Sequence, residues 1–168
     1  IGDAEIAEVV DTLRSGWVTT GPKAMRFEKA FGEFLGDTSL HCIAVNSATA
    51  GLHLALEALG IGPGDEVITT THTFTATAEV VRYLGADVRL VDIDPATLNI
   101  DPAAVEAAIT SKTKAIILNT PCNPSGAVMR EDTMAAIADH CAKTGVWIIV
   151  DLTYDKLIYE AVPHNMVK

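Results

Sequence analysis

Apolar residues in the first 35 positions recur at helical spacing and predict two helices, at residues 3–13 and 22–35. Gly16 follows the first pattern as a stop signal, and a proline opens the second. The side chains expected to face inward are Ile6, Val9, Val10 and Leu13 in the first helix and Met25, Phe27, Phe31 and Phe34 in the second.

Short apolar runs then alternate with helical patterns. We expect strands at 41–45, 66–69, 88–91, 115–118 and 146–150, and helices at 48–59, 75–84, 102–109 and 131–143. The runs are rich in β-branched residues and apolar on successive positions, which is typical of strands buried on both faces. The chain is therefore predicted to form a single α/β domain over residues 1–168, with a mostly parallel sheet flanked by helices in three layers.

Composition narrows the class of protein. A chain of 168 residues with 49% hydrophobic and 20% charged residues suits a compact fold, and no apolar run reaches the roughly 18 residues of a membrane span. The net charge of -10 would repel a nucleic-acid backbone. The three cysteines lack metal-ligand spacing, and no signal peptide opens the chain. We expect a cytoplasmic protein with reduced thiols and, at most, a small-molecule ligand.

Parallel sheets bind ligands beyond the carboxyl ends of their strands, so the residues that follow each strand are the candidates for function. The small residues at 46–51 would let backbone N–H groups at a helix start approach an anion, with Ser47 and Thr49 adding hydroxyls. An ordinary helix cap by Asn46 or Ser47 explains the same residues. Both interpretations stay open.

Three other loops carry candidates. Phe74 can stack on a planar ligand or belong to the core, and His72 can act as an acid or base or simply occupy a loop. Asn123 offers an amide within a turn-rich segment. Asp151 directly follows a buried strand, where a carboxylate is costly without a partner, and Tyr154 comes shortly after it.

A carboxylate that faces a heteroaromatic nitrogen keeps that nitrogen protonated, which is how proteins tune pyridoxal phosphate (PLP). Asp151 fits this role, and Asn123 and Tyr154 are able to hydrogen-bond the ring's phenolic oxygen. The five histidines show no ligand spacing, so no metal is expected, and no G-x-S-x-G elbow supports a hydrolase.

Several stretches up to about residue 117 resemble the fold-type I, PLP-dependent sugar-nucleotide aminotransferases, closest to those that make UDP-4-amino-4-deoxy-L-arabinose. They are Gly-Trp-Val-Thr-Thr-Gly-Pro-Lys at 16–23, Asn-Ser-Ala-Thr-Ala-Gly at 46–51, Gly-Asp-Glu-Val-Ile-Thr at 64–69 and Lys-Thr-Lys-Ala-Ile-Ile at 112–117. The resemblance implies that Ala48 and Thr49 hold the cofactor phosphate and that Phe74 stacks on the pyridine ring.

From about residue 118 to 168 the sequence instead resembles class I, aspartate-type aminotransferases, through Pro-Cys-Asn-Pro-Ser-Gly-Ala-Val at 121–128 and Asp-Leu-Thr-Tyr-Asp-Lys-Leu-Ile-Tyr at 151–159. Asp151 fits both families, whereas the roles of Asn123 and Tyr154 are implied by class I only. The abrupt change favours a chimera of two homologous folds over a natural divergent enzyme.

Both families place a Schiff-base lysine a few tens of residues beyond the aspartate, and no lysine stands there in this sequence: Lys156 is too near Asp151 and Lys168 is terminal. We therefore expect a truncated or chimeric cofactor domain, inactive alone and without a catalytic residue of its own, which does not necessarily bind PLP. The parent activity would transfer an amino group from glutamate to a keto sugar nucleotide.

Two alternatives remain: an engineered α/β scaffold without catalysis, and a fragment of an intact aspartate-type enzyme. Truncation would uncover apolar surface, which predicts a dimer or other homo-oligomer, or rearranged termini. The tail, residues 160–168, is expected to be mobile or repacked.

Overall fold

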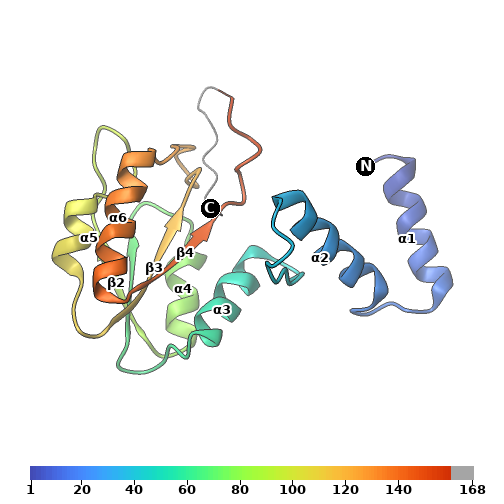
Figure 1. The fold of residues 1–168 in the computed structure, drawn as a ribbon, viewed down its shortest axis with the longest axis horizontal. Coiled ribbons are helices and arrows are strands. Elements are labelled where there is room, and N and C mark those ends of the chain that lie inside the picture. The colour runs from blue at the N-terminus through green and yellow to red at the C-terminus, as the bar shows by residue number, and fades with distance from the viewer. Residues whose placement is uncertain (160–168) are drawn as a thin grey trace. The chain divides into compact units, whose positions relative to one another are not determined.

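The computed structural model describes residues 1–159, and the chain divides after Val45 into two compact units. The first contains α1 (Asp3–Ser15) and α2 (Pro22–Leu35). The second contains α3 (Ala48–Ala58), β1 (Glu66–Thr70), α4 (Ala76–Tyr83), β2 (Asp87–Val91), α5 (Pro102–Ala108), β3 (Thr113–Asn119), α6 (Glu131–Thr144) and β4 (Trp147–Asp151) (Figure 1). The prediction for the tail falls on residues 160–168, outside the described residues.

The sheet of the second unit confirms the predicted α/β class. Its four strands lie in the order β2-β1-β3-β4, and every neighbouring pair is parallel. β1 and β3 are almost fully buried, as predicted. Burial on both faces was the wrong expectation for β2 and β4, because these strands form the two edges of the described sheet and stay partly exposed.

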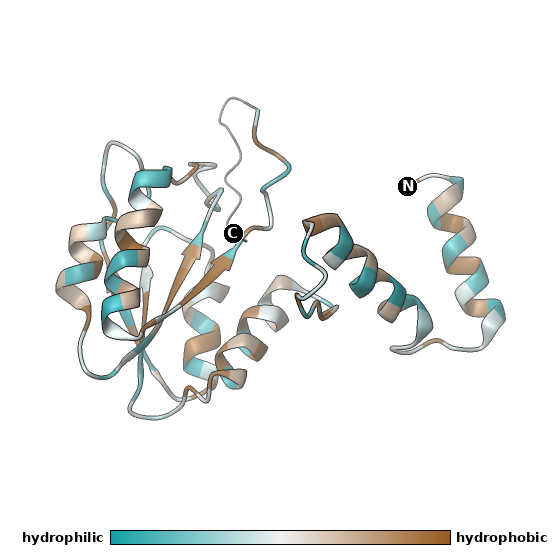
Figure 2. Ribbon diagram, in the orientation of Figure 1, coloured by the Kyte–Doolittle hydropathy of each residue, from teal (hydrophilic) through white to brown (hydrophobic). Residues whose placement is uncertain are grey.

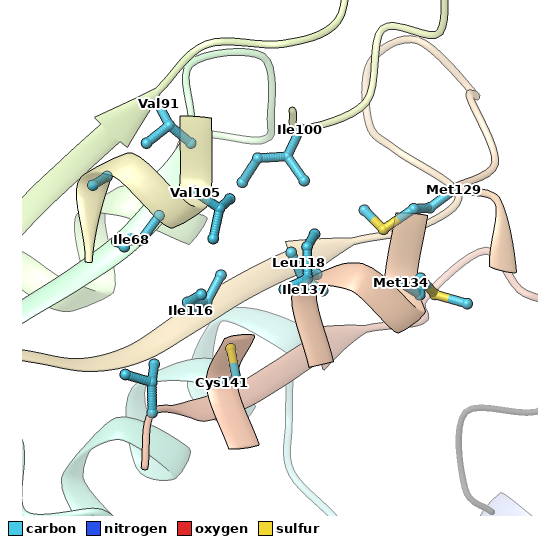
Figure 3. Close-up of a cluster of buried hydrophobic side chains, with 12 residues drawn as sticks. Ile68, Val91, Ile100, Val105, Ile116, Leu118, Met129, Met134, Ile137 and Cys141 are labelled. Carbon is cyan, nitrogen blue, oxygen red and sulfur yellow. The ribbon is translucent and has the colours of Figure 1, made fainter. Parts of the chain in front are cut away.

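Helices cover both faces of the sheet, as the three-layer prediction requires. Alternate residues of β3 point to opposite sides, so Ile116 packs with α5 and α6 while Ile117 packs with α3 and α4. Figure 3 shows the first of these clusters, in which Val105 and Ile137 meet Ile116. Figure 2 shows the apolar residues that run along β3 and β4.

Local signals in the sequence set several helix ends. The Ser47 hydroxyl accepts the Ala50 N–H at 3.1 Å and begins α3, which selects Ser47 from the two predicted caps. The Asp101 carboxylate begins α5 by accepting the Ala103 N–H at 2.9 Å. Gly145, with φ of 72°, ends α6 in the left-handed conformation that glycine adopts readily.

The predicted strand at 41–45 is absent, and this expectation was wrong. A strand exists through hydrogen bonds to a neighbouring strand, and no strand among the described residues pairs with this segment. Within the first unit, the Ala44 N–H instead donates to a Glu28 carboxylate oxygen at 2.8 Å. The apolar pattern recorded a preference for burial, and it did not show which segment would supply a partner.

The inward orientation predicted for the two N-terminal helices is also wrong within the first unit. Met25, Phe27, Phe31 and Phe34 are all exposed, Phe34 to 67%, and Ile6, Val9 and Leu13 of α1 are exposed as well. Gly32 is the one buried residue of α2, and α1 has none. Two helices and a short segment are too few to enclose a core, so these apolar side chains cover one another only partly.

Candidate functional site

The connections of the sheet point to a ligand site at one edge of it, the edge formed by the carboxyl ends of the strands. The chain passes from β1 to β2 on one side and then crosses back to β3 on the other. The carboxyl ends of β1 and β3 therefore flank a point where the direction of winding reverses, and open α/β sheets bind ligands there. The loop after β1 carries His72 and Phe74, and the loop after β3 carries Asn123.

The loop after β3 is tied to the end of β4. Asn119 and Asp151 are register partners in the sheet. The Thr120 N–H donates to the Asp151 carbonyl at 3.1 Å, and the Asn123 N–H donates to the Asn119 side-chain oxygen at 2.7 Å. These bonds hold the Asn123 backbone beside the strand end that carries Asp151.

Asn123 and Tyr154 come together although they are 31 residues apart, with the Asn123 amide nitrogen 3.4 Å from the Tyr154 hydroxyl. One oxygen of the Asp151 carboxylate, Oδ1, accepts the Thr153 N–H at 3.0 Å and the Thr153 hydroxyl at 2.6 Å. This turn sets the path of the chain from Asp151 to Tyr154. Amide, phenol and carboxylate thus occupy neighbouring positions at one sheet edge.

The loop after β1 joins the same edge. The Cys122 thiol donates to the His72 carbonyl at 3.2 Å, so the loops after β1 and β3 are in direct contact. Phe74 is 54% exposed, which removes the alternative that it belongs to the core. Its ring is available as a surface for a planar ligand.

The start of α3 supplies hydrogen-bond donors. Ser47 caps the helix, Ala48 is exposed and Thr49 is half-buried. The first N–H groups of a helix have no intrahelical acceptor and carry partial positive charge. α3 packs on β4 through the cluster around Leu56 and Ile149, and the two elements run in opposite directions in Figure 1, so α3 begins at the edge where β4 ends.

The structure links three of the six predicted cofactor residues, Asn123, Asp151 and Tyr154, through the bonds above, and places Ala48, Thr49 and Phe74 at the same sheet edge by topology. Sequence reasoning missed Asn119, although an asparagine at the last position of a buried strand was a signal. Among residues 1–159, no group of histidine, cysteine and carboxylate side chains is arranged to hold a metal ion.

A separate hollow lies inside the first unit. Residues of α1, of α2 and of the loop between them, Trp17 and Lys23 among them, line a cavity of about 470 Å³. The Lys23 ammonium lies 2.6 Å from Glu8 and 2.9 Å from Asp11, and these bonds raise the pKa of Lys23 and lower those of both carboxyls. The cation is thus already neutralised by its own unit.

Comparison with known proteins decides the family. The sequence matches the DegT/DnrJ/EryC1/StrS aminotransferase family over residues 1–153, a match that runs past residue 118 and includes Asn123 and Asp151. The chain belongs to this aminotransferase family.

Individual relatives agree with this assignment. The spore coat polysaccharide biosynthesis protein SpsC of Bacillus subtilis is 46% identical over 154 residues, which are 92% of this chain and 38% of SpsC. The PLP form of Spr1654 from Streptococcus pneumoniae is 38% identical with a TM-score of 0.77, covering 90% of this chain and 40% of that one.

NtdA of Bacillus subtilis, solved with bound pyridoxamine phosphate (PMP), is 33% identical with a TM-score of 0.76 over 90% of this chain and 34% of its own. These structures confirm the predicted parent cofactor, PLP. The chain spans well under half the length of each relative. No helix among the described residues is long and apolar enough to cross a membrane.

Proposed function

We propose that this chain is the cofactor-binding part of a PLP-dependent aminotransferase whose parent reaction moves an amino group from glutamate to a keto sugar nucleotide. Family membership supports the reaction class. The observation that carries the site is the contact between the Asn123 amide and the Tyr154 hydroxyl at 3.4 Å, beside the strand end at Asp151. An amide and a phenol beside a carboxylate form the donor and acceptor set that a substituted pyridine ring requires.

The phosphate group would bind at the start of α3. The N–H groups of Ala48 and Thr49 and the Thr49 hydroxyl are donors at a positive helix end, which suits a dianion. Ser47 positions them by capping the helix. Small side chains at Ala48 and Ala50 let the anion approach the backbone.

The ring would lie across the ends of β1, β3 and β4. The Asp151 carboxylate would hold a proton on the ring nitrogen, the Asn123 amide and the Tyr154 hydroxyl would bind the phenolic oxygen, and Phe74 would cover one face. PLP, when bound, supplies an electron sink for reactions at the amino-bearing carbon of a substrate. The residues of this chain bind and orient it.

We expect the 168-residue chain, tested as it stands, to catalyse no amino-group transfer. Amino-group transfer in both families that the sequence resembles requires a lysine well beyond the aspartate. Lys156 follows Asp151 closely, and its ammonium pairs with Asp155 at 2.9 Å. Binding without turnover is therefore the expected behaviour.

We also propose that the segment from residue 118 onward binds the ring in the aspartate-type manner, as a chimera would. The Asn123 to Tyr154 contact supports this, because both residues belong to the aspartate-type motifs. If ring binding followed the sugar-family manner instead, replacing either side chain would leave PMP affinity unchanged.

Equilibrium dialysis of the chain against PMP and against pyridoxamine tests the proposal. We expect saturable binding of one PMP, and affinity for pyridoxamine lower by at least about tenfold because the phosphate contacts are lost. Asp151→Ala should weaken PMP binding by about tenfold or more. Asp139→Ala, which removes an exposed carboxylate on α6, should not.

Covalent chemistry is tested separately by adding PLP, reducing with borohydride and measuring mass, together with a glutamate turnover assay. The proposal expects no adduct concentrated on a single lysine and no turnover. A stoichiometric adduct on one lysine with turnover would show that the chain is active alone. Absence of any saturable PMP binding would favour a scaffold without cofactor function.

A further inference from the structure

Asn119 is a buried polar residue at the point where β3 ends. Its side chain is almost enclosed, with the residue 7% exposed. It lies directly opposite Asp151 in the parallel register of β3 and β4. A buried amide is unfavourable unless its oxygen and nitrogen both find partners, so its contacts explain why it is accommodated there.

Its two polar ends contact two different parts of the site. The side-chain oxygen accepts the Asn123 N–H at 2.7 Å, a short, partly buried bond between the end of β3 and the loop that follows it. The side-chain nitrogen lies 3.5 Å from the Asp151 carbonyl, which also accepts the Thr120 N–H at 3.1 Å. The first contact is the strong one and the second is at the limit of hydrogen-bond distance.

The Asn123 loop depends on this anchor. Its other closing bonds, from Gly126 N–H to Cys122 oxygen at 2.7 Å and from Cys122 N–H to Ala127 oxygen at 2.9 Å, close the turn on itself. They fix the shape of the turn, and the Cys122 thiol ties the turn to the His72 carbonyl. The bond to Asn119 is the one that holds the Asn123 backbone itself against the end of β3. Without an acceptor at position 119, the Asn123 N–H would lose its partner and the backbone would shift to regain one.

We propose that Asn119 is a positioning residue that sets the distance between Asn123 and Asp151, and so between the groups that bind the phenolic oxygen and the nitrogen of the cofactor ring. This inference rests on the proposed function for its consequence in binding. Asn119 itself acts through Asn123 and does not contact the ring.

Hydrogen exchange of the Asn123 amide, measured by NMR on the 168-residue chain, tests the anchor without any cofactor. Asn119→Leu should speed that exchange by at least about tenfold, because the bond is lost. Asn119→Asp keeps an acceptor oxygen and should hold the rate within about threefold of wild type. If Asn119→Leu does not fold, Asn119→Ser, whose shorter side chain cannot reach, replaces it.

Thr113→Val is the matched control. Thr113 is a buried polar residue at the start of the same strand, 6% exposed, whose hydroxyl accepts the Thr110 N–H at 2.9 Å. This substitution removes a buried hydrogen bond at the opposite end of β3 from Asn119, without a contact to the loop that carries Asn123. Equal Asn123 exchange rates in the Asn119 and Thr113 variants would overturn the proposal, since only a general loosening of the fold would remain.

PMP affinity supplies the second readout. Asn119→Leu should raise the dissociation constant for PMP about tenfold, while Thr113→Val leaves it unchanged. Faster Asn123 exchange with unchanged affinity would overturn the positioning role in binding. If the wild-type chain does not bind PMP, the proposed function fails for this polypeptide, and the exchange rates alone still decide whether Asn119 anchors the loop.

Discussion

Replacing Tyr154 by phenylalanine removes one hydroxyl and keeps the ring. In the structure this hydroxyl has one described contact, with the Asn123 amide at 3.4 Å, at a half-buried position. We expect the change to affect the free protein little and cofactor binding much more, because the hydroxyl is assigned to the phenolic oxygen of the ring.

The expected losses of stability and of PMP affinity differ in size, because the hydrogen bond in the free protein joins two neutral groups whereas the bond to the cofactor would reach a charged oxygen. A neutral hydrogen bond is worth about 0.5–1.5 kcal/mol, and this one is long, so stability should fall by less than about 1 kcal/mol. A hydrogen bond to a charged oxygen is worth about 1.5–3 kcal/mol. Since the site is partly open to solvent, we take the lower value and expect PMP affinity to fall about tenfold.

Urea unfolding and PMP dialysis on the same preparations separate these effects. Tyr83→Phe is the control, because it makes the same chemical change at the far end of α4, where Tyr83 packs edge-on against His53. Equal PMP affinity in Tyr154→Phe and wild type would refute the role of Tyr154. A large stability loss without an affinity change would show that the hydroxyl is structural.

Three further predictions test the fold of the two units. Ile116→Ala, at a fully buried position, should lower the free energy of unfolding by about 2–5 kcal/mol, whereas Leu90→Ala on the exposed face of β2 should cost much less, both measured by urea unfolding. Ser47→Ala should cost about 1 kcal/mol in the same assay by removing the α3 cap, and an unchanged midpoint would count against it. In an NMR titration, Glu8 should show a pKa below its ordinary 4.5, because it pairs with Lys23. The ion pair therefore stabilises the first unit fully above pH 4.5, and this stabilisation is lost as the pH falls through the lowered pKa. Lys23→Met should return the pKa of Glu8 toward 4.5.

The sheet was predictable because the apolar residues of its central strands indicate burial. β1 and β3 carry successive apolar residues at 67–68 and 115–118, and neighbours such as Ile116 and Ile117 need cover on both faces of the sheet. The same logic failed at 41–45, since an apolar run specifies burial and not a partner. It failed again at Phe27 and Phe34, whose helical spacing predicts an apolar face but not what covers it.

The candidate site was predictable residue by residue and not as an arrangement. Asp151 was visible as a charge at the end of an apolar strand, and Asn123 and Tyr154 as polar side chains in the following loops, with roles that the class I resemblance implies. The contact between them depends on the parallel register of β3 and β4, which sequence spacing does not reveal. Asn119 was missed for the same reason, because its role is defined by a neighbour in space.

The most direct test of the account is to map PMP binding on the amide NMR spectrum of the chain. We predict saturable shifts that concentrate at residues 47–50, 119–123 and 151–154, with α6 and the exposed face of β2 unchanged. Shifts that saturate elsewhere, or no saturable shift at up to about 1 mM PMP, would contradict a cofactor site at this edge of the sheet.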